Sequence, residues 1–306
     1  MEELNAGIGR AAPPDYNSPL ALKAFMEARG MAMQKRFGQN FLVNGAARAR
    51  LADALDVLPG TCVWEVGPGL GAVTSELLRR GADVTCFEID RGFSGCLRQF
   101  FAPQIESGRL RLIEGDVLDT WRPQLEARTP GRFFGNLPYN VAATIIADTI
   151  SASVRFERAV VTVQKEVAER IAAAPASGVY SSFSVLCQWA YKVRPVLDLA
   201  GGSFWPKPKV ASRAVLLERR TEFPACKDAA LFMGMQRALF ASRRKTVRNN
   251  LTRFLSSAET ARAALHLAGI EENLRAEALR VEQLLHLSDC IHELGGNMHT
   301  KGGGSQ

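Results

Sequence analysis

Residues 64–72 read Trp64-Glu65-Val66-Gly67-Pro68-Gly69-Leu70-Gly71-Ala72, and this stretch decides the fold. The apolar run 62–66 predicts a strand, and the amphipathic pattern over residues 73–80 predicts a helix. Glycines between a strand and a helix allow a tight turn and let a ligand approach the backbone. The N–H groups at the start of the helix favour polar or anionic ligand groups. The stretch therefore predicts a strand–turn–helix unit that binds a ligand.

Short apolar runs alternate with helical patterns on both sides of this turn. The predicted strands cover residues 62–66, 84–89, 110–113, 132–135 and 159–163, with helices over residues 73–80 and 142–150. This alternation predicts an α/β fold with a parallel, doubly wound sheet that binds ligands at the carboxyl ends of its strands. Residues 186–196 and 214–217 predict further strands at an edge of the sheet.

The pattern changes to helices alone after residue 221. The predicted helices cover residues 227–240, 245–255, 258–267 and 281–294. The length of 306 residues suggests two domains at roughly 150 residues each. We expect a Rossmann-like domain over residues 34–220 and a smaller, all-helical domain over residues 221–294. Residues 1–33 are expected to be a loose extension with a short helix over residues 20–29, and residues 295–306 a fraying tail.

Positive charge is concentrated in one part of the chain. Residues 201–255 contain 12 basic and 3 acidic residues, a net charge of +9, whereas the whole chain carries +7. This predicts local contact with a polyanion, and an ordinary solvated surface is the alternative. The composition, 47% hydrophobic and 23% charged, excludes a disordered chain.

The sequence also bears on the compartment. It has neither a secretory signal pattern at its start nor an apolar run of about 20 residues that could span a membrane. The six cysteines are scattered and form no CxxC pair, so we expect reduced, mostly buried thiols and no zinc site. We therefore expect a cytoplasmic protein that binds no metal.

The glycine turn fits two kinds of nucleotide cofactor. Gly67, Gly69 and Ala72 match the G-x-G-x-x-A pattern of dinucleotide sites, and Glu88 at the end of the next predicted strand can hold ribose hydroxyls. From these residues NAD and S-adenosylmethionine both stay open, as does a plain tight turn.

Two carboxylates favour S-adenosylmethionine. Glu65 ends the strand before the first glycine, where it would attract a cationic amino-acid group and oppose a pyrophosphate. Asp116 follows the third predicted strand and can accept a hydrogen bond from an adenine amine, although an Asp at a strand end is commonly a helix cap.

The fourth predicted strand leads into Phe134-Gly135-Asn136-Leu137-Pro138-Tyr139-Asn140. The N6 amine of adenine is a poor nucleophile because its lone pair is delocalised into the ring. The side-chain oxygen of Asn136 and the carbonyl of Leu137 can accept its two hydrogens, which would localise the lone pair and aim it at a methyl donor. Pro138 stiffens the turn, and Tyr139 offers a face on which a flipped base can stack. The alternative is a surface turn.

These motifs, in this order, resemble the small-subunit (16S) rRNA adenine N6,N6-dimethyltransferases, the KsgA type. The resemblance spans residues 36–288 and includes segments at residues 38–42, 164–170, 180–185, 204–210, 243–249 and 275–277. It implies a Rossmann-like, S-adenosylmethionine-dependent methyltransferase sheet followed by a helical domain. The implied substrate is a pair of adjacent adenines in the 3′-terminal hairpin of 16S rRNA, methylated during maturation of the small ribosomal subunit.

The resemblance also implies which residues form the site. It gives a cofactor site at Asn40, Leu42, Gly67, Glu88, Asp116 and Asn136, to which the turn adds Glu65 and Gly69. Phe204 falls where relatives place a second aromatic near the target base, although a lone aromatic is commonly a core residue. Gly92 and Gly95 depart from the family pattern and leave the start of their helix open.

The basic stretch contains the predicted RNA contacts. Lys207 and Lys209 alternate with prolines after two aromatic residues, which suits an RNA strand at a stiff turn. The predicted phosphate contacts further along are Arg243, Lys245 and Arg248. Arg244 falls in the apolar stripe of its helix, so either the helix breaks near Ser242 or the stem of Arg244 packs against the core.

Three other functions are weighed. A large-subunit rRNA adenine methyltransferase of the macrolide-resistance type shares the domain plan, but the match over residues 180–185 and 275–277 favours the small-subunit enzyme. A non-enzymatic assembly or transcription factor would not need the intact set of Glu65, Glu88, Asp116 and Asn136, and an assembly role alongside catalysis stays open. An NAD oxidoreductase leaves residues 136–139 unexplained. We expect a monomer that acts on 16S rRNA within the small subunit or its precursor and binds no membrane.

Overall fold

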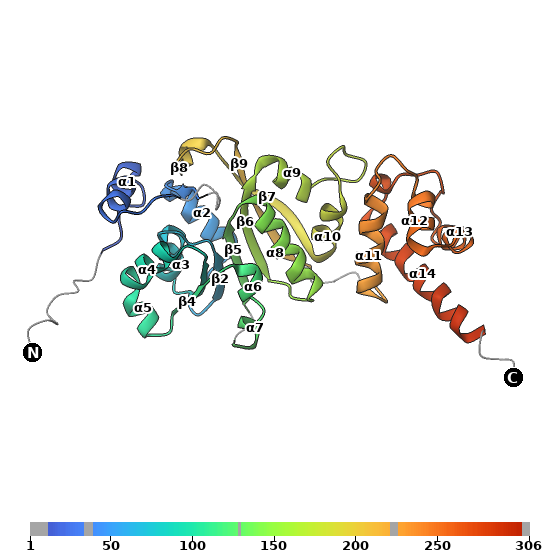
Figure 1. Ribbon diagram of the computed structural model, residues 1–306, viewed down its shortest axis with the longest axis horizontal. Coiled ribbons are helices and arrows are strands. Elements are labelled where there is room, and N and C mark those ends of the chain that lie inside the picture. The colour runs from blue at the N-terminus through green and yellow to red at the C-terminus, as the bar shows by residue number, and fades with distance from the viewer. Residues whose placement is uncertain (1–11, 34–38, 128–129, 221–225, 302–306) are drawn as a thin grey trace, which may run out of the picture. The chain divides into compact units, whose positions relative to one another are not determined.

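The computed structural model describes residues 12–33, 39–127, 130–220 and 226–301. The chain forms two compact units (Figure 1). The first unit contains Met1–Ile145, Phe156–Ala168 and Arg194–Glu218, and the second unit contains Ile146–Arg155, Glu169–Val193 and Arg219–Gln306. The predicted helical domain lies within Arg219–Gln306, the last segment of the second unit. The second unit also contains Ile146–Arg155 and Glu169–Val193, which the sequence assigns to the Rossmann-like domain. The domain bounds themselves stay a prediction.

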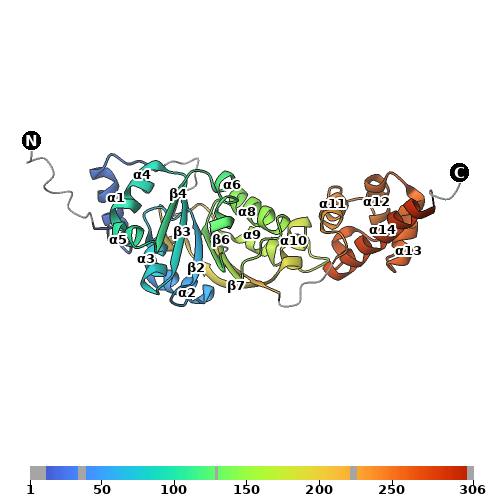
Figure 2. The same ribbon diagram turned by 90° about the horizontal axis from the view of Figure 1, so that it is seen from below.

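A seven-stranded sheet is the framework of the fold, in the order β4-β3-β2-β5-β6-β9-β7 (Figure 2). The strands are β2 (Cys62–Val66), β3 (Asp83–Glu88), β4 (Leu110–Glu114), β5 (Arg132–Asn136), β6 (Arg158–Gln164), β7 (Tyr191–Leu199) and β9 (Ser212–Arg219). Strands β2 to β6 pair in parallel, and β9 pairs with β6 antiparallel. The predicted parallel sheet is confirmed. Strand order reverses between β2 and β5, and at such a point the carboxyl ends of the strands form a ligand site.

The first unit surrounds the sheet with helices. They are α1 (Pro19–Ala28), α2 (Gly45–Leu55), α3 (Ala72–Arg79), α4 (Arg91–Phe100), α5 (Ala102–Glu106), α6 (Val117–Thr120) and α7 (Gln124–Ala127), and α8 (Tyr139–Ser151) runs from this unit into the second. Strands β2 and β6 are almost fully buried, as expected where helices cover both faces of a parallel sheet. The predicted helices over residues 73–80 and 142–150 are confirmed as α3 and α8.

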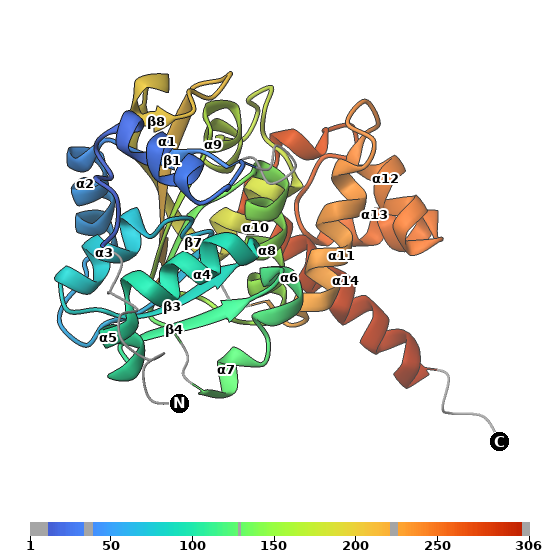
Figure 3. The ribbon, with the colours of Figure 1, turned by 60° about the vertical axis from the view of Figure 1, so that its left-hand side comes forward.

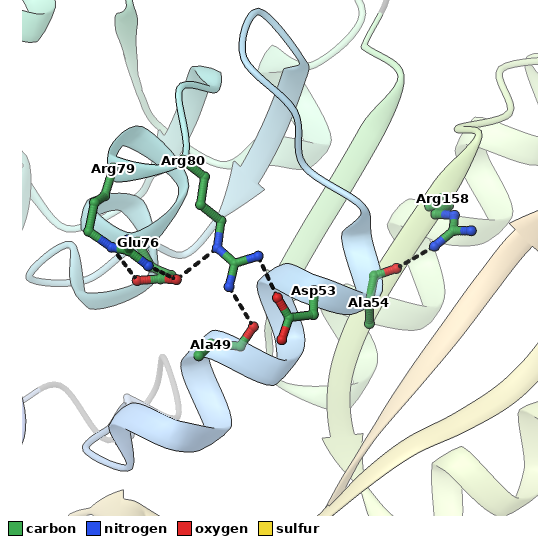
Figure 4. A network of polar contacts seen from close by, with 7 residues as sticks. All are labelled: Ala49, Asp53, Ala54, Glu76, Arg79, Arg80 and Arg158. Carbon is green, nitrogen blue, oxygen red and sulfur yellow. Dashed lines mark hydrogen bonds and ion pairs between the residues drawn. The ribbon is translucent and has the colours of Figure 1, made fainter.

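An arginine just beyond α3 fastens this helix to α2 (Figure 4). Arg80 donates to Oε1 of Glu76 at 2.8 Å, to Oδ1 of Asp53 at 2.6 Å and to the Ala49 carbonyl at 3.1 Å. The guanidinium has several donors in a fixed plane, so one side chain can satisfy acceptors on two helices. The network holds the helix that the glycine turn opens.

One predicted strand is wrong in its first half. Residues 186–190 belong to helix α10 (Ser182–Ala190), and only the following residues form β7. The helix begins with a capping box between Ser181 and Ser184, and six of its nine residues are buried. The short apolar run of a largely buried helix cannot be told from that of a buried strand by periodicity alone. The predicted strand over residues 214–217 is confirmed as part of β9.

Helix α4 begins directly after β3, despite its glycines. Asp90 is the N-cap and accepts hydrogen bonds from the N–H groups of Gly92 and Phe93 at 2.9 and 3.2 Å. The sequence did not define where this helix starts because of Gly92 and Gly95, and the Asp90 cap fixes the start at Arg91.

The predicted short helix over residues 20–29 is confirmed as α1, and its Leu22 and Met26 are buried within the first unit, so residues 19–28 are not a loose extension. At the other end α14 (Val281–Lys301) continues through the residues expected to fray. Residues 1–11 and 302–306 lie outside the described part of the chain.

The last segment of the second unit is helical as predicted, with α11 (Ala229–Phe240), α12 (Val247–Leu255), α13 (Ala258–Leu267) and α14. The chain leaves the helical path between α11 and α12, and Thr246 caps α12. Arg244 lies in this break and is exposed. Of the two alternatives for Arg244, the broken helix is therefore the one the structure has.

Two general properties follow from the described residues. The six cysteines are free thiols, and four of them are buried. Within the described ranges, no helix combines the length and the apolar character needed to cross a membrane.

Candidate active site

A cavity of about 250 Å³ opens at the carboxyl ends of β2, β3, β4 and β5, within the first unit. Its walls include every residue predicted to bind the cofactor and three of those predicted to hold the adenine. These lining residues are Asn40, Leu42, Glu65, Gly67, Gly69, Glu88, Asp116, Asn136, Leu137 and Pro138. The structure thus brings together residues nearly 100 positions apart in the sequence.

The glycine turn adopts a backbone that other residues rarely take. Gly67 and Gly69 have φ values of +71° and +58°. A Cβ at Gly67 would stand 3.3 Å from Cδ2 of Leu137, and one at Gly69 would stand 3.1 Å from the Phe41 ring. The left-handed backbone conformation therefore favours glycine at both positions. The close approach of Leu137 to Gly67 and of Phe41 to Gly69 also leaves little room for a Cβ atom.

Glu88 ties the turn to the end of β3. Its Oε2 accepts the Gly69 N–H at 3.0 Å, and its Oε1 accepts the Asp90 N–H at 2.8 Å. Burial raises the pKa of Glu88 to about 7, although these two hydrogen bonds oppose the rise. A carboxylate with two oxygens has remaining acceptor sites for ligand hydroxyls.

Glu65 is the most deeply buried acid of the cavity, with 1% of its surface exposed. Burial raises the pKa of Glu65 to about 7, opposed by hydrogen bonds from the Thr74 hydroxyl and the Cys86 thiol and increased by the nearby Glu88 charge. The Cys86 sulfur lies 3.7 Å from Oε2 of Glu65. Among the described residues, no basic side chain forms an ion pair with either glutamate.

Asp116 has the role of a helix cap and also lines the cavity. It is the N-cap of α6, and its Oδ1 accepts the Leu118 N–H at 2.9 Å. One oxygen is thus used by the helix. The other, Oδ2, accepts no hydrogen bond from the described residues and stays available to a ligand.

Asn136 has its amide held in one orientation. Its Nδ2 donates to the backbone carbonyl of Asn40 at 3.0 Å. A carbonyl can only accept, so the amide nitrogen must face Asn40 and the amide oxygen must face away from it. In the part of the chain that the structure describes, nothing donates to this oxygen. The site therefore presents an unpaired acceptor beside the cavity.

The turn after Asn136 fits closely against two glycines. A Cβ at Gly135 would stand 2.8 Å from Cδ1 of Leu137, and Gly67 approaches the other branch of the same side chain. Glycine at these positions lets Leu137 and Pro138 line the cavity. Tyr139 begins α8, but its side chain lies outside the described residues, so its stacking role stays a prediction.

Phe204 is buried next to a cavity residue. It is 5% exposed, pairs with Leu42 in the short sheet of β1 (Phe41–Leu42) and β8 (Phe204–Trp205), and belongs to a hydrophobic cluster with Leu42. It does not itself line the cavity, and its contact with a base stays a prediction. Lys207 and Lys209 follow β8 in the first unit, and both are exposed.

The other predicted RNA contacts lie in the second unit. Arg243 donates to Oε2 of Glu277 at 3.1 and 2.9 Å, and Arg248 donates to Oε2 of Glu272 at 3.0 Å. Lys245 is exposed and has no ion-pair partner among the described residues. Exposed ion pairs contribute little stability, so these arginines can exchange a carboxylate for a phosphate at low cost.

Several lining residues were not predicted from the sequence. Ile89 is 41% exposed beside Glu88, and Val117 follows Asp116 at the cavity wall. Both extend apolar stretches that indicated only core. Gln39 was quoted only as part of a motif, yet it lines the cavity and donates to Asp90 at 3.2 Å.

The two buried glutamates predict how stability depends on pH. Both hold their protons up to about pH 7 in the folded chain, against an ordinary pKa of 4.5. Between these values the folded chain binds more protons than the unfolded chain, so the free energy of unfolding falls as pH rises. We expect the stabilising contribution to be complete below pH 4.5 and lost above about pH 7.

This prediction can be tested by urea denaturation of the ligand-free protein between pH 5 and 7.5. The Glu65→Gln variant, which is neutral throughout, is expected to show a shallower fall than the wild type, since a shift of one pKa unit corresponds to about 1.4 kcal/mol. Identical slopes for the two proteins would contradict the assignment of a proton to Glu65.

Comparisons with known proteins point to one family. A family model described as ribosomal RNA adenine dimethylase matches residues 30–293. A ribosomal RNA small subunit methyltransferase A from Treponema denticola is 46% identical over 287 residues, which cover 92% of this chain and 98% of the relative.

Two solved structures share the fold. The 23S rRNA methyltransferase ErmE has a TM-score of 0.62 at 25% identity, with 82% of this chain and 99% of that chain covered. A dimethyladenosine transferase from Plasmodium falciparum has a TM-score of 0.67 at 23% identity, with coverages of 80% and 94%. Both cover far more than the cofactor-binding sheet alone.

Proposed function

The chain belongs to the ribosomal RNA adenine dimethylase family, a family of S-adenosylmethionine-dependent enzymes, and on this basis we propose how its site acts and on which RNA. The proposed substrate is the pair of adjacent adenines in the 3′-terminal hairpin of 16S rRNA, each receiving two methyl groups at N6. The enzyme acts in the cytoplasm as a monomer, on the small ribosomal subunit or its precursor.

The cavity has the chemistry of an S-adenosylmethionine site. Its acidic lining residues are Glu65, Glu88 and Asp116, and no basic side chain of the described residues lines it. A cationic ligand group would stabilise the ionised form of these acids, two of which have a pKa raised to about 7 by burial, and hydroxyls could donate to them, whereas a pyrophosphate would oppose their ionisation. When bound, S-adenosylmethionine supplies an electrophilic methyl group on a sulfonium. Glu88 would hold ribose hydroxyls, and Asp116 an exocyclic amine.

The observation that carries the proposal is the orientation of Asn136. With its nitrogen bonded to Asn40, its oxygen is the acceptor that an adenine N6 amine requires. A second acceptor, the Leu137 carbonyl, would take the other hydrogen and hold the nitrogen lone pair toward the cofactor side of the pocket. The methylated nitrogen is acidic enough to lose its proton to water, so the site needs no strong general base.

A large-subunit RNA is the second candidate substrate. The likeness to ErmE, a 23S rRNA methyltransferase, favours it. The relative from T. denticola, a small subunit methyltransferase at 46% identity, favours the small subunit. Incubation with labelled S-adenosylmethionine and under-methylated subunits separates the two. We expect label in small subunits only, and label in large subunits alone would overturn the proposal.

The basic residues predict a salt-dependent step in RNA binding. Replacing Arg243, Lys245 and Arg248 together with Ala is expected to weaken binding of the 16S hairpin and to flatten its salt dependence, because each lost phosphate contact removes about 0.7–0.9 from the slope of log K against log salt. Filter binding from 50 to 300 mM salt measures both. An unchanged slope would show that these side chains meet no phosphate.

A further inference from the structure

A turn near the start of the described chain joins two walls of the cofactor cavity. We propose that Tyr16, Asn17 and helix α1, called here the N-terminal clasp, position β1 and the glycine turn for S-adenosylmethionine. This inference rests on the proposed use of the cavity. It gives the segment upstream of β1 a function in cofactor binding rather than in RNA contact.

Tyr16 holds the glycine turn. Its hydroxyl donates to the backbone carbonyl of Leu70 at 2.8 Å. Leu70 follows Gly69, which lines the cavity and donates to Glu88. Burial raises the pKa of Tyr16 far above its ordinary value, so the hydroxyl keeps its proton and donates throughout the neutral range.

Asn17 holds β1 through a buried arginine. Arg48 on α2 is 8% exposed and donates to the Leu42 carbonyl and to Oδ1 of Asn17, both at 2.7 Å. Burial lowers the pKa of Arg48, and the described residues offer it no carboxylate ion pair. A buried guanidinium is costly without acceptors, so Asn17 contributes one of the two bonds that keep Arg48 against β1.

Helix α1 adds an apolar contact to the same walls. Leu22 and Met26 are buried in a cluster with Phe41 and Phe93, and these two rings line the cavity. Figure 3 shows α1 beside β1. The two rings meet edge to face with centroids 5.5 Å apart, so a shift of α1 would be transmitted to both.

The clasp therefore contacts residues that line or adjoin the cavity, while none of its own residues lines the cavity. Its residues are positioning residues, and their loss should affect cofactor binding more than the chemical step. For a positioning role we expect a higher Kd and KM for S-adenosylmethionine and an unchanged kcat at saturating cofactor. A purely structural role would instead lower the melting temperature and leave these constants of the folded enzyme unchanged.

The test uses calorimetric titration with S-adenosylmethionine and steady-state methyl-transfer kinetics on the full chain. Tyr16→Phe, which removes only a hydroxyl, is expected to weaken cofactor binding about three- to tenfold. Asn17→Ala should weaken it to a similar degree, while Asn17→Asp keeps an acceptor for Arg48 and should stay within about twofold of the wild type.

The matched control is Tyr180→Phe in the second unit. The Tyr180 hydroxyl is buried, and no described residue forms a hydrogen bond with it, so its removal should leave the cofactor Kd unchanged. If Tyr16→Phe and Asn17→Ala bind as the wild type does, or lose kcat at constant KM, the clasp inference is overturned. A wild-type protein that binds no S-adenosylmethionine would instead refute the proposed cavity itself.

Discussion

Replacing Asn136 with Ala is expected to lower kcat for methyl transfer by about 100- to 1000-fold, the range found when one preorganised hydrogen-bonding group is removed from an active site. The acceptor that would hold the adenine amine is lost, and the nitrogen lone pair is no longer directed. The Kd for S-adenosylmethionine should change by less than about tenfold, since only one of several lining groups is removed. Single-turnover kinetics and calorimetry measure the two quantities on the same preparation.

The Asn136→Asp variant separates the acceptor from the donor function of this side chain. It keeps an oxygen acceptor but loses the Nδ2 that donates to the Asn40 carbonyl. Turnover between that of the wild type and that of the Ala variant is therefore expected. Full turnover by Asn136→Ala would contradict the assignment, because the chemistry would then proceed without the acceptor.

Replacing Gly71 with Ala is expected to lower the free energy of unfolding by about 2–5 kcal/mol. Gly71 has φ of +89°, a conformation that costs a non-glycine residue roughly 1–2 kcal/mol. A Cβ would also stand 2.5 Å from the Phe101 ring and 3.0 Å from Leu97. Both neighbours are buried, so repacking around the new methyl group adds about 1–3 kcal/mol.

Gly95 provides the matched control for this prediction. It lies within α4, and a Cβ there meets no atom within 4 Å. Ala favours a helix over Gly by about 1 kcal/mol, so Gly95→Ala should be neutral or stabilising. Equilibrium urea denaturation of both variants tests the contrast. Equal free energies of unfolding for the Gly71→Ala and Gly95→Ala variants would show that the turn after β2 tolerates a side chain.

The sequence was most informative where local chemistry is strict. The strand over residues 62–66 was predicted with the bounds it has in the structure. The glycine turn and Asn136 were recognised because few other residues could replace them. The acids at the strand ends followed from the rule that ligands bind at the carboxyl edge of a parallel sheet.

The remaining features depend on contacts between distant residues. The bond from Asn136 to Asn40 spans 96 positions, and the bond from Tyr16 to Leu70 spans 54. Neither has a local signature. Leu22 and Met26 are spaced for one helix face, yet nothing in their own segment shows that Phe41 and Phe93 cover them. The packing of residues 12–33 was therefore missed.

Helix α10 shows the same limit in another form. An apolar run can be a buried strand or a buried helix, and residues 186–190 are helical. Tertiary packing decides between these two alternatives, which are equal in local chemistry.

The most direct measurement is to map the methylated nucleosides after the enzyme has acted on under-methylated small subunits with labelled S-adenosylmethionine. Nuclease digestion and mass spectrometry of the rRNA identify each site and its number of methyl groups. We expect N6,N6-dimethyladenine at two adjacent positions of the 3′-terminal hairpin of 16S rRNA, formed about 100- to 1000-fold more slowly by the Asn136→Ala variant. Methylation at any other nucleotide, or at a base atom other than N6, would contradict the adenine pocket built by Asn136 and the turn that follows it.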